Sequence, residues 1–523
     1  MIIVGMAGAH AKASCAVVKD GHLAAAVEEQ KLSRQKQVGG LPEHSLAFCL
    51  KQAGVHPNDV NFVAMVRPLA SSADARIHLE LRQRFPNSQL VVVDHHLAHA
   101  AAAYYLSPFS DAKILTLDRS GDLRCGALWN ASGTEIDLER ELYFPDSIGH
   151  LYGRVTQLLG FIPGSDEHKV QWLSASGDTR FVDLFSQILS AGEWPRLDRS
   201  FFDGNRIGQG GFSAQFYHAL GLADGEAPPA ELHPHIAAGM QRAMEHAVIR
   251  MAGQGERLCL GGGLGLNALL VEALERCGNW REVYVQPAAG NAGSCLGAAA
   301  YAWHHACREQ ARISLDHLFL GPEFSPEAIK QVIENCKLRF RYLLTTDELI
   351  DAAVAELNAH KIVAWMQGRM EFGPRALGNR SLLASPLDPY STENLNAFIK
   401  HREGFRKFAA SVPAEIAADY FEVGPNSRFL ATVGRVRPAH RDRFASAILG
   451  QDIVRVHTVA EKDNPLYWRL LHAAGKSTGL PVLYNTSFNL FGDPLVCNPR
   501  DAVRSFYSSG VDSMFVGHFG LLK

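Results

Sequence analysis

The sequence predicts a mixed α/β protein in which one unit of the fold occurs twice. Residues 2–6 predict a strand, and residues 14–18 and 23–27 predict a hairpin, because the intervening Asp20-Gly21 supplies the positive φ that a tight turn needs. A strand over 114–117, followed by a second hairpin, begins about 110 residues later. The repetition indicates a duplicated fold, and the alternation of helical and strand patterns between the two copies is typical of α/β proteins.

Each further element is predicted from its periodicity or its flanking residues. Helices are predicted over 43–52, 73–85, 236–251 and 268–276, and strands over 60–66, 90–93, 125–129, 135–142, 258–260 and 283–285. The helix over 236–251 has apolar residues at helical spacing and polar residues such as Gln241 and Arg242 on its other face. An alanine-rich helix is expected to end near His305.

The chain length and the positions of glycine and proline residues predict two domains. The chain has 523 residues, which is enough for more than one core. Gly321-Pro322 and Pro326 interrupt the regular patterns and predict a linker over 313–335, between an N-terminal domain over 1–312 and a C-terminal domain over 336–523. Residues 180–230 show no strong period, so we expect an insertion or cap there.

Composition excludes several classes of function. The hydrophobic share of 47% and charged share of 20% exclude large-scale disorder. A net charge of −3 gives no field that attracts a polyanion, so nucleic acid is not an expected partner. The nine cysteines never form a C-x-x-C pair, which indicates reduced thiols and a cytoplasmic location. No apolar run approaches the roughly 18 residues that span a bilayer, so no membrane role is expected.

Two histidines and an aspartate form a candidate metal site. His95 and His99 are four residues apart, so in a helix they share one face at a spacing suited to metal ligands. Asp118 ends a predicted strand, where side chains of α/β sheets open onto ligand-binding crevices. The H-x-x-x-H pattern alone is weak evidence, and an aspartate at this place equally suits a turn cap.

A glycine-rich loop is a candidate anion site. A predicted strand runs into residues 261–267, and a predicted helix follows. Gly262, Gly263 and Asn267 are therefore expected to lie where backbone N–H groups at a helix N-terminus bind an anion.

The densest cationic stretch lies between residues 369 and 407, with seven Lys or Arg against four Asp or Glu. Guanidinium groups bond phosphate and carboxylate oxygens bidentately, so this stretch is a candidate phosphate site. A solvated charged face is the alternative. The segment LYNTSFN (483–489) ends a predicted strand in small polar residues, which suit either ligand binding or a hydrogen-bonded turn. The basic residues concerned are Arg369, Arg375, Arg380, Lys400, Arg402 and Arg406.

Taken together, these segments resemble the NodU/CmcH-type O-carbamoyltransferases over nearly the whole chain. Members of this family pair an actin-like ATPase-type N-terminal domain with a YrdC-like α/β C-terminal domain, so the resemblance implies this fold. The motifs that carry it are VEEQKLSRQK (27–36), VVDHHLAHAAAAYY (92–105), LTLD (115–118), SIGHLYGRVTQLLGF (147–161), SDEHKV (165–170), LCLGGGLGLN (258–267), QPAAGNAG (286–293), QGRMEFGPRALGNRSLLA (367–384) and VLYNTSFNLFGDPL (482–495).

The resemblance implies a reaction in two steps. The YrdC-like domain forms carbamoyl adenylate from carbamoyl phosphate and ATP, and the N-terminal domain transfers the carbamoyl group to a hydroxyl of a small metabolite. The implied cofactors are ATP, Mg²⁺ and a divalent transition metal such as Fe²⁺. The sequence does not determine whether the protein forms a homodimer.

The resemblance also implies roles for single residues. His95, His99 and Asp118 match the family's metal ligands, and Asn291 stands where the family carries an aspartate. An amide oxygen contributes no charge and binds a transition metal more weakly, so the identity and affinity of the metal stay open. The other residues with implied roles in catalysis are His10, Asp118 and Lys169, with His10 or a neighbour taking the acceptor proton. Those with implied roles in nucleotide binding are Lys400, Arg402, Arg406, Arg455, Thr486, Ser487 and Asn489.

Three other interpretations share parts of this pattern. The adenylate can serve carbamoylation of an amine or transfer of another acyl group. A non-catalytic binding subunit is suggested by Asn291, but the arginine cluster and the NTSFN segment argue against it. Modification of tRNA is disfavoured by the near-neutral charge.

Overall fold

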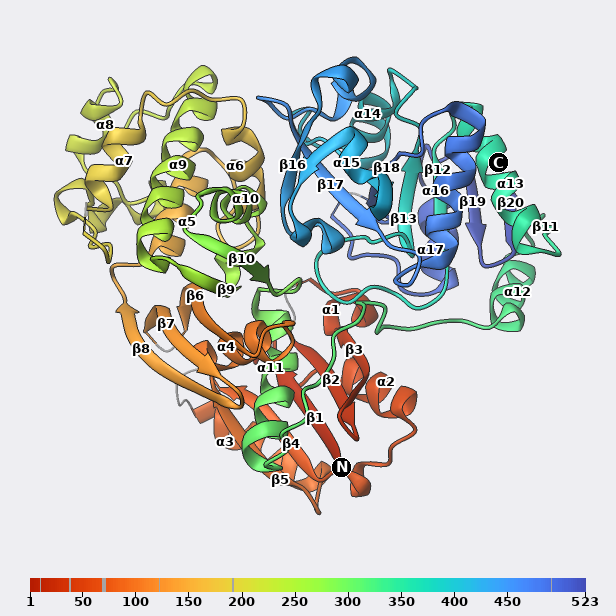
Figure 1. The fold of residues 1–523 in the computed structure, drawn as a ribbon, viewed down its shortest axis with the longest axis horizontal. Helices are drawn as coiled ribbons and strands as arrows, with labels where there is room; N and C mark the ends of the chain where they lie inside the picture. Colours follow the sequence, from red (N-terminus) through yellow and green to blue (C-terminus); the bar gives the residue numbers. More distant parts are fainter. Residues whose placement is uncertain (10, 37–38, 68–71, 122, 191, 491) are drawn as a thin grey trace.

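The computed structural model describes residues 1–523 except 10, 37–38, 68–71, 122, 191 and 491. Three β-sheets organise the chain (Figure 1), two in the N-terminal part and one in the C-terminal part. The first sheet has the order β3-β2-β1-β4-β5. Its strands are β1 (Ile2–Ala7), β2 (Ser14–Lys19), β3 (His22–Glu28), β4 (Phe62–Arg67) and β5 (Gln89–Asp94).

The second sheet repeats the topology of the first. Its order, β8-β7-β6-β9-β10, has antiparallel pairs where the first sheet has antiparallel pairs and parallel pairs where the first has parallel ones. The predicted duplication is therefore confirmed. The strands are β6 (Asp111–Gly121), β7 (Arg124–Ser132), β8 (Glu135–Tyr143), β9 (Gly255–Gly261) and β10 (Trp280–Val285).

Two alanine-rich helices lie between these sheets (Figure 1), α4 (His95–Tyr105) and α11 (Ser294–Tyr301). Their backbones approach closely because small residues meet at the contact. A Cβ added to Gly297 would lie 1.8 Å from the backbone oxygen of Ala98, and one added to Gly5 of β1 would lie 2.2 Å from that of Cys295. The close approach brings the start of α4, which carries His95 and His99, against both halves of the duplicated unit.

The segment without periodicity, 180–230, packs as a small cap on α9 (His233–Ala252). It holds α7 (Val182–Ile188) and α8 (Ala214–Ala219), and its buried aromatic residues Phe185, Phe212 and Phe216 join the core of the second half. The structure thus shows this segment as a cap, as expected. The remaining N-terminal helices are α1 (Glu29–Ser33), α2 (Glu43–Ala53), α3 (Ser72–Arg84), α5 (Ile148–Leu158), α6 (Glu167–Ser174) and α10 (Ala268–Arg276).

The C-terminal domain is built on a mixed sheet of ten strands in the order β11-β20-β19-β12-β13-β18-β14-β17-β16-β15. The pairs β12–β19 and β14–β17 are parallel, and the others are antiparallel. The strands are β11 (Arg341–Tyr342), β12 (Val363–Met366), β13 (Arg380–Ala384), β14 (Ala409–Pro413), β15 (Phe421–Val423), β16 (Val433–Val436), β17 (Ile453–Val459), β18 (Leu483–Ser487), β19 (Ser513–Val516) and β20 (Phe519–Leu522).

Helices cover both faces of this sheet, so its central strands are apolar on both sides. Alternate residues of β12 serve the two layers. Val363 and Trp365 pack with α13 (Thr346–Asn358) and α16 (Pro465–Thr478), while Ala364 and Met366 pack on the face of α12 (Pro326–Asn335) and α17 (Pro499–Tyr507). The short helices α14 (Ser391–Asn394) and α15 (Ala417–Tyr420) complete the domain.

Two predicted boundaries are wrong. The linker over 313–335 is shorter than expected, because 326–335 form α12 and bury Ile329 and Ile333 in the C-terminal core. Strand β6 does not end at Asp118 but continues to Gly121 after a register shift beyond Leu117. That irregularity places the Asp118 side chain at a break in the pairing with β7.

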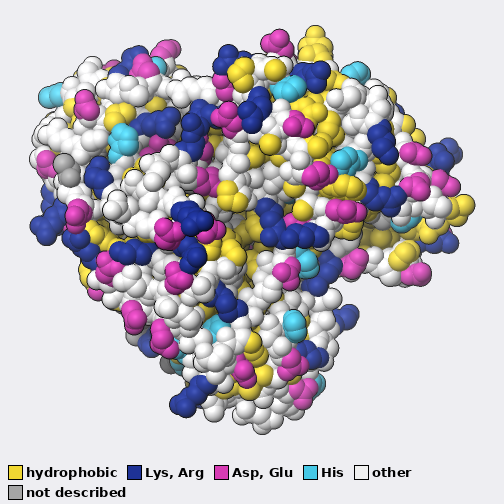
Figure 2. Space-filling model, in the orientation of Figure 1, with side chains coloured by type: hydrophobic (Ala, Val, Ile, Leu, Met, Phe, Trp, Pro, Cys, Tyr) yellow, Lys and Arg dark blue, Asp and Glu magenta, His cyan; other side chains and the backbone are white. Residues whose placement is uncertain are grey.

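The surface matches the near-neutral composition. Figure 2 shows acidic and basic side chains interspersed over the visible face of the molecule, without a large region of one sign. None of the described helices is both long and apolar enough to cross a bilayer.

Candidate active site

Helix α4 positions the two histidines of the metal motif. Strand β5 ends at Asp94, whose carboxylate accepts a hydrogen bond of 3.1 Å from the backbone N–H of Leu97 and caps the helix. His95 and His99 therefore occupy the same side of the first turns of α4, as their spacing predicts for a helix.

Both histidines converge on Asp118. The Nε2 atoms of His95 and His99 lie 3.1 Å and 3.3 Å from the same Oδ2 atom of Asp118, and the three ligand atoms lie within 4.8 Å of one another. Burial opposes ionisation of Asp118, but the close contacts with the His95 and His99 imidazoles hold its pKa well below the usual range. Burial also lowers the pKa of His99. The cluster thus pairs a carboxylate with two imidazoles inside the protein.

These residues fit a divalent metal. The Nε2 atom of His99 is buried and forms no hydrogen bond of good geometry with the described residues, which is expected of an atom that ligates an ion. Asn291 lies at the start of α11 on η6 (Asn291–Gly293), and its side chain interacts with His99. Two imidazole nitrogens, a carboxylate and an amide oxygen suit a transition metal better than Mg²⁺.

His96 has a different role from its neighbours. Its Nδ1 lies 3.0 Å from the hydroxyl of Thr116, and its Nε2 lies 3.1 Å from the backbone oxygen of Arg124. Burial, followed by the charges of His95 and His99, lowers the pKa of His96 to about 3. With both ring nitrogens engaged, this histidine joins α4 to the second sheet.

The glycine loop packs directly against Asp118. A Cβ on Gly262, whose φ is +87°, would lie 2.2 Å from the backbone oxygen of Leu117, and one on Gly263 would lie 2.8 Å from Oδ1 of Asp118. A side chain at Gly262 would displace the backbone of β6, whereas a side chain at Gly263 would displace the carboxylate of Asp118. Gly263 lines a cavity and Gly262 packs against the backbone of β6, and the binding role expected of both glycines stays a prediction.

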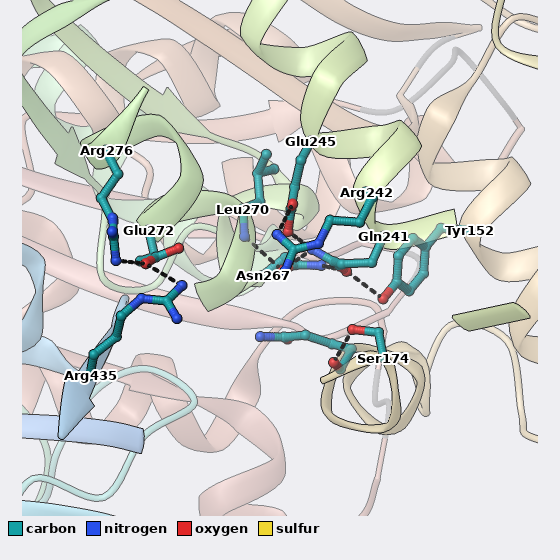
Figure 3. Close-up of polar contacts among 11 residues, drawn as sticks. Tyr152, Ser174, Gln241, Arg242, Glu245, Asn267, Leu270, Glu272, Arg276 and Arg435 are labelled. Atoms are coloured by element: carbon teal, nitrogen blue, oxygen red, sulfur yellow. Dashed lines mark hydrogen bonds and ion pairs between the residues drawn. The ribbon is translucent and has the colours of Figure 1, made fainter. Parts of the chain in front are cut away.

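Asn267 caps α10 and ties it to α9. Its Oδ1 accepts from the backbone N–H of Leu270 at 3.0 Å, and its amide pairs reciprocally with that of Gln241 at 3.1 Å and 2.9 Å. Figure 3 shows Tyr152 and Glu245 converging on the same Gln241 side chain. The amide of Asn267 is therefore largely committed to this network, although the residue lines the cavity.

One cavity of about 460 Å³ joins the two candidate sites. The N-terminal domain contributes Asp118, Asn291 and the glycine loop, and the C-terminal domain contributes the cationic wall and the end of β18. The sequence placed these groups in different domains, and the structure places them around one space. The predicted residues that line it are Asp118, Gly263, Asn267, Asn291, Arg375, Arg402, Arg406, Arg455, Thr486 and Ser487.

The C-terminal wall of the cavity has excess positive charge. Of Arg375, Arg402, Arg406 and Arg455, only Arg406 forms an ion pair with a carboxylate among the described residues, at 3.6 Å from Glu403. Burial lowers the pKa of Arg375 to about 10, and burial together with Arg406 lowers that of Arg402 to about 9. Arginines brought together without matching carboxylates favour a bound polyanion such as a nucleotide phosphate.

Lys400 is buried next to this wall and contacts the loop that contains Ser487 and Asn489. It ends η8 (Leu395–Lys400), is buried, and donates to the backbone oxygen of Ser487 at 2.5 Å and to Oδ1 of Asn489 at 2.6 Å. Burial, followed by the charges of Arg402 and Arg406, lowers its pKa well below the usual value. Lys400 thus fixes the loop that presents Ser487 and Asn489.

Two predicted phosphate-binding arginines are structural. Arg380 is fully buried and donates to four backbone oxygens, at distances from 2.6 Å to 3.1 Å. Arg369 donates to the backbone oxygens of Gly321, Ala24 and Leu320, so it joins the C-terminal domain to the first sheet. Neither lines the cavity, so the structure gives no support to the expectation that they bind phosphate.

Lys169 and His10 are the other two residues that were predicted to be catalytic. The ammonium group of Lys169 lies 2.8 Å from Glu403 and 3.2 Å from Asp166, so it bridges the two domains and does not line the cavity. Its expected catalytic role stays a prediction. His10 lies outside the described residues.

Several cavity residues were not singled out from the sequence. Glu167 and His168 sit inside the quoted SDEHKV motif, and Tyr152 sits inside SIGHLYGRVTQLLGF, so the motifs carried a signal. Arg119 follows Asp118 directly. Lys12 and Gln171 also line the cavity, and nothing in their local pattern distinguishes them.

Residues 66–300 match the family description "Carbamoyltransferase N-terminus", and residues 354–523 match "Carbamoyltransferase C-terminus". Both descriptions are of a group-transfer enzyme. The chain belongs to the carbamoyltransferase family, which confirms the predicted family and enzyme class.

Two relatives match nearly the whole chain, and a third matches half of it. Nodulation protein NolNO of Sinorhizobium fredii is 33% identical over 97% of this chain and 78% of its own length. An uncharacterised protein of Synechocystis is 31% identical over 100% of this chain and 96% of its own. The 3'-hydroxymethylcephem-O-carbamoyltransferase of Amycolatopsis lactamdurans is 32% identical over 50% of this chain and 48% of its own.

Similarity to solved structures is weak. The HypF structure from T. kodakarensis has a TM-score of 0.32 at 12% identity, and covers 57% of this chain and 47% of that one. Component A of the (R)-2-hydroxyglutaryl-CoA dehydratase of Acidaminococcus fermentans has a TM-score of 0.38 at 16% identity, and covers 59% of this chain and 99% of that one.

Proposed function

We propose that this carbamoyltransferase is ATP-dependent and acts through carbamoyl adenylate on a hydroxyl of a small metabolite. The observation that carries the proposal is the shared cavity of about 460 Å³, which Asp118 and Asn291 line from one domain and four arginines line from the other. Three of these arginines have no ion pair with a carboxylate of the described residues. A cavity that touches both domains lets an activated carbamoyl group form and react without release into water, where it would hydrolyse.

The chemistry of the first step suits the C-terminal wall. Water hydrolyses carbamoyl phosphate to carbamate and phosphate, a carbamate oxygen then attacks the α-phosphorus of ATP, and the bond from that phosphorus to the β-phosphate oxygen breaks as pyrophosphate leaves. Arg375, Arg402, Arg406 and Arg455 offset the negative charge of the phosphates, and the hydroxyls of Thr486 and Ser487 offer further hydrogen bonds. ATP enters as its Mg²⁺ complex.

The second step belongs at the N-terminal side. His95, His99 and Asp118, with Asn291 beside them, would hold a divalent transition metal such as Fe²⁺. When bound, such a metal supplies a Lewis acid that polarises a carbonyl or phosphoryl oxygen. The glycine loop with Gly263 keeps the backbone close to Asp118, so a ligand can reach this wall of the cavity.

A hydroxyl acceptor is supported by the relatives. The name of the Amycolatopsis relative states transfer to the oxygen of a hydroxymethyl group. The near-neutral charge of this chain, −3, favours a small acceptor over a nucleic acid.

The test is incubation of the purified protein with Mg-ATP and carbamoyl phosphate in the absence of an acceptor. Mass spectrometry should detect carbamoyl adenylate, and pyrophosphate should accumulate only when both substrates are present. A reaction without carbamoyl phosphate is the control. Detection of bound nucleotide with neither product would overturn the proposal and favour a binding-only protein.

A further inference from the structure

Trp172 is a large aromatic side chain that the N-terminal domain buries at its boundary with the C-terminal domain. It lies on α6, and only 4% of it is exposed. Its ring belongs to one apolar cluster with Leu269 of α10 and with Val433 and Ile453 of β16 and β17 (Figure 1). It is not among the described residues that line the cavity or form the metal cluster, so neither site explains its place.

The indole ring of Trp172 faces the guanidinium group of Arg455. The central carbon of that group lies 5.0 Å from the centroid of the ring. Arg455 stands on β17, beside Val433 of β16 and Ala409 of β14, and it lines the cavity. A cation within about 6 Å of an indole centroid is attracted by the negative face of the ring. The contact therefore joins an N-terminal side chain to an arginine of the C-terminal wall.

The charge of Arg455 lacks a polar partner. In the part of the chain that the structure describes, its guanidinium group forms no hydrogen bond and no ion pair. Burial, followed by the charges of Arg375, Arg402 and Arg406, lowers the pKa of Arg455 well below the usual value. An arginine stays protonated in proteins, so these like charges push the group away from the wall. The attraction of the indole face offsets that repulsion.

An aromatic partner suits a group that must bind a ligand. A carboxylate in the place of the indole would neutralise the charge of Arg455 and accept hydrogen bonds from its N–H groups. The ring does neither, so the positive charge and the N–H donors of the guanidinium group stay available. Charged donors of this kind are what phosphate oxygens bond most strongly.

A second contact from the same helix reaches the arginine wall. Lys169, three positions before Trp172, lies 2.8 Å from Glu403, and Glu403 lies 3.6 Å from Arg406. Helix positions three apart are neighbours on the helix surface. Helix α6 is thus connected to two of the four arginines, to one through an aromatic ring and to the other through a carboxylate.

We propose that Trp172 is a positioning residue that holds Arg455 in place to bind a phosphate group during formation of carbamoyl adenylate. This inference rests on the proposed function. The indole contacts no reacting atom, and its effect passes through the guanidinium group of Arg455. A charge that is fixed before the ligand arrives binds it more strongly, because less binding energy is lost in ordering the side chain. The N-terminal domain therefore contributes to the first step as well as to the second.

The first test is a double-mutant cycle on adenylate formation. Release of pyrophosphate from Mg-ATP and carbamoyl phosphate gives kcat/KM for the native protein, Trp172→Leu, Arg455→Met and the double variant. Leucine keeps an apolar side chain at the boundary but has no aromatic face. Trp172→Leu should lower kcat/KM by about 5- to 30-fold, the range of a partly or fully desolvated cation–π contact. In the Arg455→Met background the same change should have less than about a twofold effect, because the group on which the indole acts is gone.

Two further variants separate positioning from packing. Trp172→Phe keeps an aromatic face and should restore kcat/KM to within about threefold of the native value. Leu449→Ala removes apolar contacts from the same cluster and leaves the indole in place. It should lower the free energy of unfolding measured with urea and keep the native kcat/KM. Equal losses of kcat/KM in Leu449→Ala and Trp172→Leu would overturn the proposal, because packing alone would then explain both.

A binding measurement tests the contact without turnover. The native protein, Trp172→Leu and Arg455→Met are titrated in a calorimeter with Mg-ATP and, separately, with carbamoyl phosphate. Trp172→Leu should bind at least one of these ligands about 5- to 30-fold more weakly, and it should be the ligand whose affinity Arg455→Met also reduces. Native affinity of Trp172→Leu for both ligands would overturn the proposal.

The outcomes distinguish the two proposals. If the native protein releases no pyrophosphate from the two substrates, the proposed function fails and the role of Trp172 falls with it. If the native protein forms adenylate and Trp172→Leu has the native kcat/KM, only the positioning role is overturned. Losses that multiply in the double variant would also overturn this role, because Trp172 and Arg455 would then act independently.

Discussion

Arg375 of the C-terminal domain donates a hydrogen bond of 3.0 Å to the backbone oxygen of Leu266, in the glycine loop of the N-terminal domain. The bond holds a guanidinium group across the cavity that lies between the domains. Burial lowers the pKa of Arg375 to about 10, so the group stays charged at neutral pH. Its position makes Arg375 the residue that links the phosphate wall to the loop beside Asp118.

Arg375→Ala should therefore reduce formation of carbamoyl adenylate by at least 10²-fold, because a preorganised charge at the phosphates is lost. Arg375→Lys should restore little, since an ammonium group cannot bond two oxygens in one plane. Release of pyrophosphate measures the rate. Arg341→Ala, on the exposed edge strand β11, is the matched control and should retain the native rate. A rate for Arg375→Ala within fivefold of the native one would contradict the assignment.

His99→Ala should separate the two half-reactions. We expect adenylate formation to persist, because His99 lies at the N-terminal side, and carbamoyl transfer to stop. Elemental analysis should find less transition metal in this variant than in the native protein, whereas His22→Ala, at an exposed position, should retain it. Equal loss of adenylate formation in the His99 and Arg375 variants would contradict the division of roles between the domains.

Arg380→Ala should act on stability. The buried guanidinium satisfies four backbone oxygens that would lose their partners, at a cost of about 3 kcal/mol or more in the free energy of unfolding. Urea unfolding measures this change. The folded fraction should form adenylate at close to the native rate, which is the opposite pattern to that of Arg375→Ala. An Arg380→Ala variant with native stability but no adenylate formation would contradict the structural role and indicate that Arg380 binds phosphate.

Glu245→Gln should change how stability depends on pH. Glu245 is 3% exposed and accepts hydrogen bonds of 2.9 Å from Gln241 and Arg242 (Figure 3). Burial raises its pKa, and the contacts with Arg242 and Gln241 only partly oppose the rise. The folded protein then binds this proton more tightly than the unfolded chain, so the native protein loses stability as the pH rises from the usual glutamate value through the raised one.

The variant lacks this ionisation. The free energy of unfolding of Glu245→Gln minus that of the native protein should therefore increase as the pH rises from about 4 and should level off above the raised pKa. Urea unfolding across this range provides the measurement. A difference that stays constant with pH would show that Glu245 has an ordinary pKa in the folded protein.

Much of the fold could be predicted because local patterns agree with it. The hairpin at Asp20-Gly21 forms with positive φ at both residues, and the second sheet repeats the first as the duplicated pattern indicates. Helix α12 was missed because Pro326 suggests a linker, although proline is also favoured at the first position of a helix and stands there in this structure. The buried face with Ile329 and Ile333 decided the outcome.

The candidate site was predictable to the level of motifs. The H-x-x-x-H spacing placed His95 and His99 on one face of a helix, and the resemblance added Asp118 and Asn291. Sequence reasoning did not separate Arg375, which faces the cavity, from Arg380, which is buried against backbone oxygens, since both stand in one cationic stretch. Sequence reasoning did not identify His168 as a cavity residue, because the neighbouring Lys169 was interpreted as the functional residue of the motif.

The sequence by itself determined the duplicated α/β architecture, the family and the residue types of two chemical sites, because these depend on periodicity, turn residues and spacing along the chain. Only the tertiary structure decided that Asp118 and Arg375 border the same cavity, and that Arg369, Arg380 and Lys169 turn away from it. The direction of a long side chain depends on which acceptors the packed domains bring within its reach, and residues far apart in the sequence supply those acceptors.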